Sequence, residues 1–84
     1  MFYVYILKSA LNSSYYVGCT GDLSERLKLH NSGQVNSTKR YAPWTMVYSE
    51  KYNNLNEARL RELQIKSWKK RSAIERLINN AAMV

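Results

Sequence analysis

The stretch that decides the fold is FYVYIL at residues 2–7. It is rich in β-branched and aromatic residues and is followed by a turn-forming cluster at residues 12–14, so we predict a β-strand. Because side chains alternate along a strand, residues 2, 4 and 6 would face one side of a sheet and residues 3, 5 and 7 the other.

The next strand signal, YYVG at residues 15–18, predicts an antiparallel hairpin partner for the first strand. Gly18 would permit a ligand or another backbone to approach closely. In one register Tyr5 and Tyr16 share a face, whereas a slip by one residue would put Tyr15 in the place of Tyr16. Both registers remain open at this point.

A helix is predicted after the hairpin. Asp22 can cap its free amides, with Glu25 three residues later as in a capping box, and residues 31–33 (NSG) would end it. Arg26 and His30 are four residues apart, so they would face the same neighbour. They lie along the edge of the inward-facing stripe that the helix forms with two leucines, Leu23 and Leu27.

The second half of the chain predicts a surface loop with Lys39-Arg40-Tyr41, a strand over residues 45–52 and a helix opening at Leu55. A last helix would run from about Ser72 to Ile78, with Trp68 near the junction of the two helices. We therefore expect an α/β (α+β) fold in the order ββαβαα, a small three-stranded antiparallel sheet flanked by helices. The 84 residues would form one domain, residues 1–84.

The helix that opens at Leu55 carries a carboxylate inside an apolar seam. At about 100° per residue, one stripe about 80° wide contains Leu55, Ala58, Glu62 and Ile65. Three polar side chains fall off this seam and would be solvated: Glu57, Arg59 and Gln64. Leu60 and Leu63 lie on another side, where we expect the last helix to cover them.

Composition narrows the possible partners. Thirteen Lys and Arg against six Asp and Glu give a net charge of +7, which favours a polyanion, most commonly nucleic acid. One cysteine excludes an intramolecular disulfide, and one histidine with one cysteine excludes the usual zinc ligand sets. No apolar run approaches a membrane span and no signal peptide precedes the first strand, so we expect a cytoplasmic protein without membrane contact.

Five features occur in a characteristic order: Tyr3-Val4-Tyr5, Tyr16-Val17-Gly18, Arg26, His30 and Glu62. Together they resemble the GIY-YIG nuclease family, over nearly the whole chain. The chain is most similar to the small stand-alone bacterial proteins of that superfamily, and it also resembles the nuclease domain of the DNA-repair excinucleases. The resemblance implies an endonuclease that hydrolyses DNA phosphodiester bonds, with structure- or damage-directed DNA processing or repair as its expected role.

The resemblance also implies roles for five side chains. Tyr5 would be the general base or orient the attacking water, with Tyr16 as its partner. Arg26 would contact the scissile phosphate, His30 would assist proton transfer or phosphate binding, and Glu62 would hold one Mg²⁺ (or Mn²⁺). A single carboxylate is enough for magnesium, which keeps several waters and also binds substrate phosphate.

Other interpretations of these residues stay open. Glu62 could be a structural carboxylate paired with Arg26, His30 a packed or capping residue, and the tyrosines ordinary packing residues. The first motif lacks the family's initial glycine, and Cys19 stands where some members carry a lysine. Cys19 itself is expected to be a buried, inert thiol. Many family members have a late asparagine, for which residues 79 and 80 are both candidates (Asn79, Asn80).

The remaining cations would contact phosphates without reading base sequence. The DNA-binding candidates are Lys39, Arg40, Lys66, Lys69, Lys70 and Arg71. Two alternatives remain: a non-catalytic nucleic-acid-binding module with this fold, and an interaction protein of a repair complex whose basic face meets an acidic partner. Oligomeric state and the physiological DNA substrate are left open.

Overall fold

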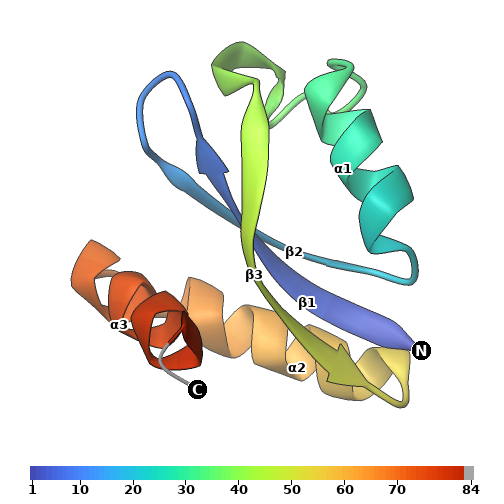
Figure 1. Ribbon diagram of the computed structural model, residues 1–84. Helices are drawn as coiled ribbons and strands as arrows, with labels where there is room; N and C mark the ends of the chain where they lie inside the picture. Colours follow the sequence, from blue (N-terminus) through green and yellow to red (C-terminus); the bar gives the residue numbers. More distant parts are fainter. Residues whose placement is uncertain (83–84) are drawn as a thin grey trace.

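A three-layer α+β arrangement forms the protein in the computed structural model, which describes residues 1–82 (Figure 1). In chain order the elements are β1 (Phe2–Ser9), β2 (Tyr15–Thr20), α1 (Leu23–Asn31), a 3₁₀ turn η1 (Lys39–Tyr41), β3 (Trp44–Tyr52), α2 (Leu55–Lys66) and α3 (Arg71–Ala82). This order confirms the predicted fold class and its ββαβαα sequence. Among residues 1–82, none of the helices is long and apolar enough to cross a membrane.

β1 is the central strand of the sheet, whose order is β2-β1-β3 with both pairings antiparallel. Tyr5 lies opposite Gly18 and Leu7 lies opposite Tyr16, which resolves the register left open by the sequence. Tyr5 and Tyr16 therefore share one face of the sheet. A register shift in the β1–β3 pairing between Ile6 and Leu7 marks a β-bulge on the other side of β1.

The two faces of the sheet carry separate apolar clusters, as the alternation along β1 predicts. α1 covers the face of Tyr5 and Leu7 and contributes two leucines to that cluster (Leu23, Leu27). On the opposite face, α2 and α3 pack over a cluster with five buried members: Val4, Ile6, Val17, Ala58 and Ile65. Figure 1 shows α1 on one side of the sheet and the other two helices on the opposite side.

The helix caps follow from the residues before each helix. Asp22 accepts a hydrogen bond from the amide of Glu25 at 3.1 Å and so caps α1. In a capping box the Glu25 side chain would accept a hydrogen bond from the Asp22 amide. Here this amide donates instead to Thr20 Oγ1 at 3.1 Å. Asn54 caps α2 in the same way, accepting from the amide of Glu57 at 2.9 Å.

Two expectations about α2 are wrong. Leu60 and Leu63 are 69% and 63% exposed, and Leu55 is also exposed instead of lying in the buried seam. The reason is the position of α3, which packs against the sheet-side cluster through Ile74, Leu77 and Ile78 and lies beside α2 instead of over its outer face. Trp68 does pack against that cluster, near the α2–α3 junction, as predicted.

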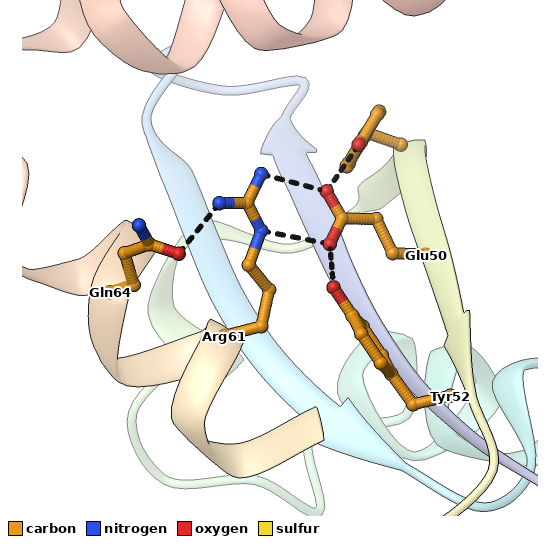
Figure 2. Close-up of polar contacts among 5 residues, drawn as sticks. Glu50, Tyr52, Arg61 and Gln64 are labelled. Atoms are coloured by element: carbon orange, nitrogen blue, oxygen red, sulfur yellow. Dashed lines mark hydrogen bonds and ion pairs between the residues drawn. The ribbon is translucent and has the colours of Figure 1, made fainter. Parts of the chain in front are cut away.

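A polar clip joins α2 to β3 on this face of the sheet (Figure 2). Arg61 Nε and Nη2 donate to the two carboxylate oxygens of Glu50 at 2.9 and 3.0 Å. The Tyr52 hydroxyl donates to the same carboxylate at 2.6 Å, and so does the hydroxyl of Tyr48. Arg61 also donates to Gln64 at 2.7 Å. The carboxylate is thus closed off by donors from both elements.

The clip shifts the pKa values of its members. Burial alone would raise the pKa of Glu50, but the hydrogen bonds from Arg61, Tyr48 and Tyr52 lower it further than burial raises it. The pKa of Tyr48 is raised to about 12 by burial and by its bond to the carboxylate. A carboxyl whose pKa is lowered in the folded state stabilises the fold above its unfolded pKa, and this contribution disappears as the pH falls through the folded value.

We predict that Glu50→Gln lowers the free energy of unfolding at pH 7 by about 1–3 kcal/mol, because it leaves the Arg61 guanidinium without its anion in a half-buried site. The loss should shrink as the pH falls below about 4, because the glutamate of the unfolded chain then takes up a proton, and it should disappear below the lowered folded pKa of Glu50. Urea unfolding at pH 7 and at pH 3.5 measures both effects, with the exposed Glu57→Gln on α2 as the matched control. A variant as stable as this control at pH 7 would contradict a stabilising role for the clip.

Candidate functional site

The Tyr5 phenol lies at the centre of the candidate site. Its side chain is buried and lies over Gly18, the residue opposite it on β2. A Cβ at Gly18 would overlap the Tyr5 hydroxyl and ring, lying 2.9 Å from Cε1. The absence of a side chain at this position is therefore what lets the phenol lie across β2. The sequence predicted a close approach at Gly18, and the approaching group is the tyrosine ring.

Two side chains of α1 hold the Tyr5 hydroxyl. Arg26 Nε donates to it at 3.4 Å, and the hydroxyl lies 2.9 Å from His30 Nε2. Because Arg26 and His30 are one helical turn apart on α1, both reach the same atom. The predicted pair thus faces one common neighbour, and that neighbour is Tyr5.

The other ring nitrogen of His30 is held by Thr38, in the segment between α1 and η1. His30 Nδ1 lies 2.7 Å from Thr38 Oγ1, and this hydroxyl donates to the Val35 carbonyl at 3.4 Å. Since the carbonyl can only accept, Thr38 Oγ1 accepts from Nδ1–H, and in the neutral ring Nε2 is then the acceptor. The guanidinium can only donate. The hydrogen bonds therefore run in one direction: Arg26 donates to the Tyr5 hydroxyl, and this hydroxyl donates to His30 Nε2.

Aromatic rings enclose this chain of hydrogen bonds. The Tyr16 ring packs edge-on against His30, with ring centroids 5.0 Å apart, and against Trp44 at 6.4 Å. Trp44 Nε1 in turn donates to the Thr38 carbonyl at 2.8 Å. Tyr16 lies next to Tyr5, with ring centroids 6.4 Å apart. Its position between Tyr5 and Trp44 fits a packing partner of the hydrogen-bonded tyrosine.

Burial and charge set the protonation of the site. Burial lowers the pKa of His30, and the nearby positive charge of Arg26 lowers it further. Burial raises the pKa of Tyr5; Arg26 opposes this rise, while Tyr16 and Glu62 add to it. The pKa of Arg26 is raised, chiefly by its hydrogen bond to Tyr5. At neutral pH the site thus holds a neutral imidazole, a protonated phenol and a charged guanidinium.

Glu62 lies on the flank of α2 that faces β2. Its charge raises the pKa of Tyr5 and, after burial, also that of Cys19 on β2. The carboxylate pairs with Lys66, one turn further along α2, with Nζ and Oε2 2.8 Å apart. The alternative pairing with Arg26 is not among the ion pairs of the described residues.

The donors near Glu62 fit a magnesium-type site better than a metal cage made of protein alone. Among residues 1–82, no group of three or more His, Cys, Asp or Glu side chains lies close enough to hold an ion. Mg²⁺ often takes only one or two carboxylates and completes its shell with water and substrate phosphate. Glu62 matches that requirement, because it is partly open to solvent and close enough to Tyr5 for its charge to raise the phenol pKa.

Cys19 is half-buried instead of fully buried, at the edge strand β2. Burial and the charge of Glu62 raise the pKa of its thiol, so it stays protonated. The predicted inert thiol is consistent with this environment, because the thiolate is the reactive form.

The candidate DNA-binding cations are all exposed, and they lie in two places. Lys39 and Arg40 are on η1, directly after the buried Thr38. The other four follow one another around the end of α2 and the start of α3: Lys66, Lys69, Lys70 and Arg71. The Arg71 guanidinium stacks over the Tyr15 ring, 4.5 Å from its centroid.

The two late asparagines lie on α3, away from the Tyr5 hydrogen bonds. Asn79 lines a pocket of about 200 Å³ together with Lys8, Tyr15 and Glu75, and Asn80 is exposed. Tyr15 and Val47 border this pocket and also pack against the cluster on the α2 and α3 side of the sheet, the opposite face from Tyr5.

Thr38 is the site residue that sequence reasoning missed. It is fully buried and fixes the tautomer of His30 from eight residues away, across a polar segment that predicts only a surface loop. No motif or periodicity marks it. Glu50 was missed as well, although a signal was present, since Tyr48, Glu50 and Tyr52 alternate on β3 and so share a face.

We predict that His30 titrates below pH 6.5 and that Arg26→Gln raises its pKa without restoring the ordinary value, because burial remains. NMR titration of the imidazole measures both, with the exposed Lys28→Gln on α1 as the charge-matched control. Since the folded state binds the proton more weakly than the unfolded chain, stability should fall as the pH drops from about 6.5 through the folded pKa. An unshifted His30 pKa in Arg26→Gln would contradict the electrostatic coupling.

Comparison with known proteins identifies the family of this chain. The family model described as the GIY-YIG catalytic domain matches residues 1–77. A UPF0213 protein of Clostridium perfringens is 43% identical over 67 residues, which cover 79% of this chain and 71% of the relative. A UPF0213 protein of Staphylococcus haemolyticus is 35% identical over 74 residues, 87% of this chain and 89% of the relative.

The fold also matches a solved structure. The solution NMR structure of a UPF0213 protein from Bacillus halodurans superposes with a TM-score of 0.60 at 32% identity, covering 94% of this chain and 84% of that one. Family model, sequence relatives and structure agree: this chain belongs to the GIY-YIG catalytic domain family, among the small UPF0213 proteins.

Proposed function

We propose that this protein is a metal-dependent endonuclease that hydrolyses DNA phosphodiester bonds and acts on branched, damaged or single-stranded DNA in DNA processing or repair. The observation that carries the proposal is the Tyr5 hydroxyl held between Arg26 and the neutral His30, with Glu62 close enough to influence its pKa. The family supports a nuclease reaction. The net charge of +7 supports an anionic substrate.

The hydrogen bonds suggest how a water molecule is activated. As the water attacks phosphorus, the Tyr5 oxygen would take its proton while the phenol passes its own proton to His30 Nε2, which already faces it at 2.9 Å. The bond between phosphorus and the leaving oxygen breaks, and the leaving oxygen takes a proton from solvent. Thr38 keeps the imidazole in the tautomer that can receive this proton. The high pKa of Tyr5 is then no obstacle, because free phenolate never accumulates.

Arg26 links substrate binding to this proton transfer. Its fork of donors suits a phosphate oxygen and would stabilise the charge that develops there. The same guanidinium lowers the pKa of His30 in the free protein. When a phosphate neutralises Arg26, His30 becomes more basic, so its capacity to accept the Tyr5 proton rises at the moment the substrate is bound.

Glu62 is the proposed ligand of one Mg²⁺ or Mn²⁺ ion, which when bound would supply positive charge to the phosphate in the transition state. The remaining cations would hold the DNA backbone. Their contribution should weaken steeply with salt, because phosphate contacts release counterions. These contacts favour DNA shape over base sequence.

We expect wild-type protein to cut at least one of a panel of labelled duplex, single-stranded, flap and junction DNAs with Mg²⁺ or Mn²⁺ and not with chelator. Tyr5→Phe and Glu62→Gln should each slow cutting by about 10²–10⁴-fold. Tyr5→Phe should leave DNA affinity unchanged, and Glu62→Gln should still bind DNA. Tyr41→Phe on η1 and the exposed Glu57→Gln are the matched controls. Salt-sensitive binding without any cutting by wild type would instead support a non-catalytic binding module. Loss of both binding and cutting in Glu62→Gln would make that residue structural.

We expect Gly18→Ala both to slow cutting and to destabilise the fold. The added methyl overlaps the rigid Tyr5 ring, so overpacking should cost about 1–3 kcal/mol, and displacement of the hydroxyl should cost about 10²-fold in rate. Gly21→Ala is the control, because the nearest atom to its Cβ is 3.7 Å away. Cutting rates and thermal unfolding separate the two effects. A Gly18→Ala variant that cuts like Gly21→Ala would contradict the position assigned to the phenol.

A further inference from the structure

Arg61 and Glu62 are neighbouring residues of α2, and each forms an ion pair. The two pairs differ in the number of hydrogen bonds that hold the carboxylate. Arg61 holds Glu50 with two donors, and the hydroxyls of Tyr48 and Tyr52 occupy the same carboxylate (Figure 2). Glu62, by contrast, has a single partner among the ion pairs and hydrogen bonds of the described residues, the ammonium of Lys66. The Arg61–Glu50 pair is held by several hydrogen bonds, whereas the Lys66–Glu62 pair depends on a single contact.

The Glu62 carboxylate needs a cation as a partner because its side chain is largely buried. Its side chain is only 17% exposed, and an anion this far from water must be paired. Lys66 provides the charge through one contact, Nζ to Oε2 at 2.8 Å, from a flexible side chain that is 45% exposed. An ammonium is a point charge without the fixed geometry of a guanidinium, so it can leave without dismantling a network.

A divalent ion and the Lys66 ammonium would compete for the negative charge of the Glu62 carboxylate. At contact distance the two cations repel each other, and the half-buried position weakens screening by water. Binding of a metal would therefore weaken the ion pair between Lys66 and Glu62 and favour release of the ammonium. The released ammonium would remain tethered to α2, one helical turn from Glu62, where it could contact a phosphate.

We propose that Lys66 is a resident substitute for the metal: it neutralises Glu62 in the metal-free protein, is displaced by the divalent ion, and then binds a phosphate of the nucleic acid. The proposal rests on the proposed function, because it takes Glu62 as the metal ligand. It makes metal binding and DNA binding mutually reinforcing, since each favours the state in which the Lys66 ammonium has left Glu62.

Metal affinity without DNA tests the first half of the proposal. Mn²⁺ binding is measured by EPR of the free ion at pH 7.5 on the full 84-residue chain. Lys66→Met should tighten the dissociation constant by about threefold to tenfold, because no ammonium has to be displaced. Lys66→Arg should weaken it by a similar factor, because a guanidinium can hold the carboxylate with two bonds. Lys69→Met controls for the loss of one charge.

The opposite signs expected for Lys66→Met and Lys66→Arg separate displacement from a structural role, which would move both variants in the same direction. A Mn²⁺ affinity for Lys66→Met within twofold of that of Lys69→Met would overturn the proposal. Equal Mn²⁺ binding by wild type and Glu62→Gln would overturn the metal role of Glu62 in the proposed function, and the proposal about Lys66 with it.

DNA affinity tests the second half. Fluorescence anisotropy in the Tyr5→Phe background, which prevents cutting, compares Mn²⁺ with chelator. Lys66→Met should weaken DNA binding about threefold more in Mn²⁺ than in chelator, where Lys66 is held by Glu62, whereas Lys69→Met should lose about the same affinity under both conditions. An equal loss under both conditions would overturn the exchange and leave Lys66 as an ordinary phosphate contact.

Discussion

The site depends on one steric constraint, the close approach of the Tyr5 ring to the backbone of β2 at Gly18. Tyr5 belongs to the central strand, so its backbone is fixed by hydrogen bonds on both sides. With no side chain opposite it, the phenol can lie flat enough for α1 to reach its hydroxyl with Arg26 and His30. Position is therefore set by rigid elements, and α1 adds only the donors and acceptors.

The features that could be predicted from the sequence are those that follow from the regular periodicity of strands and helices. Alternation along β1 predicted its two faces, and i,i+4 spacing on α1 predicted that Arg26 and His30 meet one neighbour, as they do. The register of β2 could not be predicted, because both Tyr15 and Tyr16 suit either face; packing of the Tyr16 ring among His30 and Trp44 is a tertiary effect.

Irregular backbone explains the rest of what the sequence left out. Thr38 is brought under His30 by a segment without periodicity, so no pattern could announce it. The prediction that the last helix packs over Leu60 and Leu63 is wrong for a different reason. Apolar residues on one side of a helix do not always contact another element, and these two are exposed. A folded surface normally retains apolar area, and α3 gains more by packing on the sheet.

The charge of Arg26 would make the proposed site behave differently before and after a phosphate binds. Among residues 1–82, Arg26 has no carboxylate in an ion pair with it. Burial lowers the pKa of the His30 imidazole, and the positive charge of Arg26 lowers it further. An anion bound at Arg26 removes that effect and returns basicity to the group that faces the Tyr5 hydroxyl. Under the proposed mechanism, this site would discourage proton transfer until a phosphate binds, because the guanidinium that would bind the substrate also lowers the basicity of His30. Burial of His30 and Thr38 strengthens this control, since charge effects are larger where water is excluded.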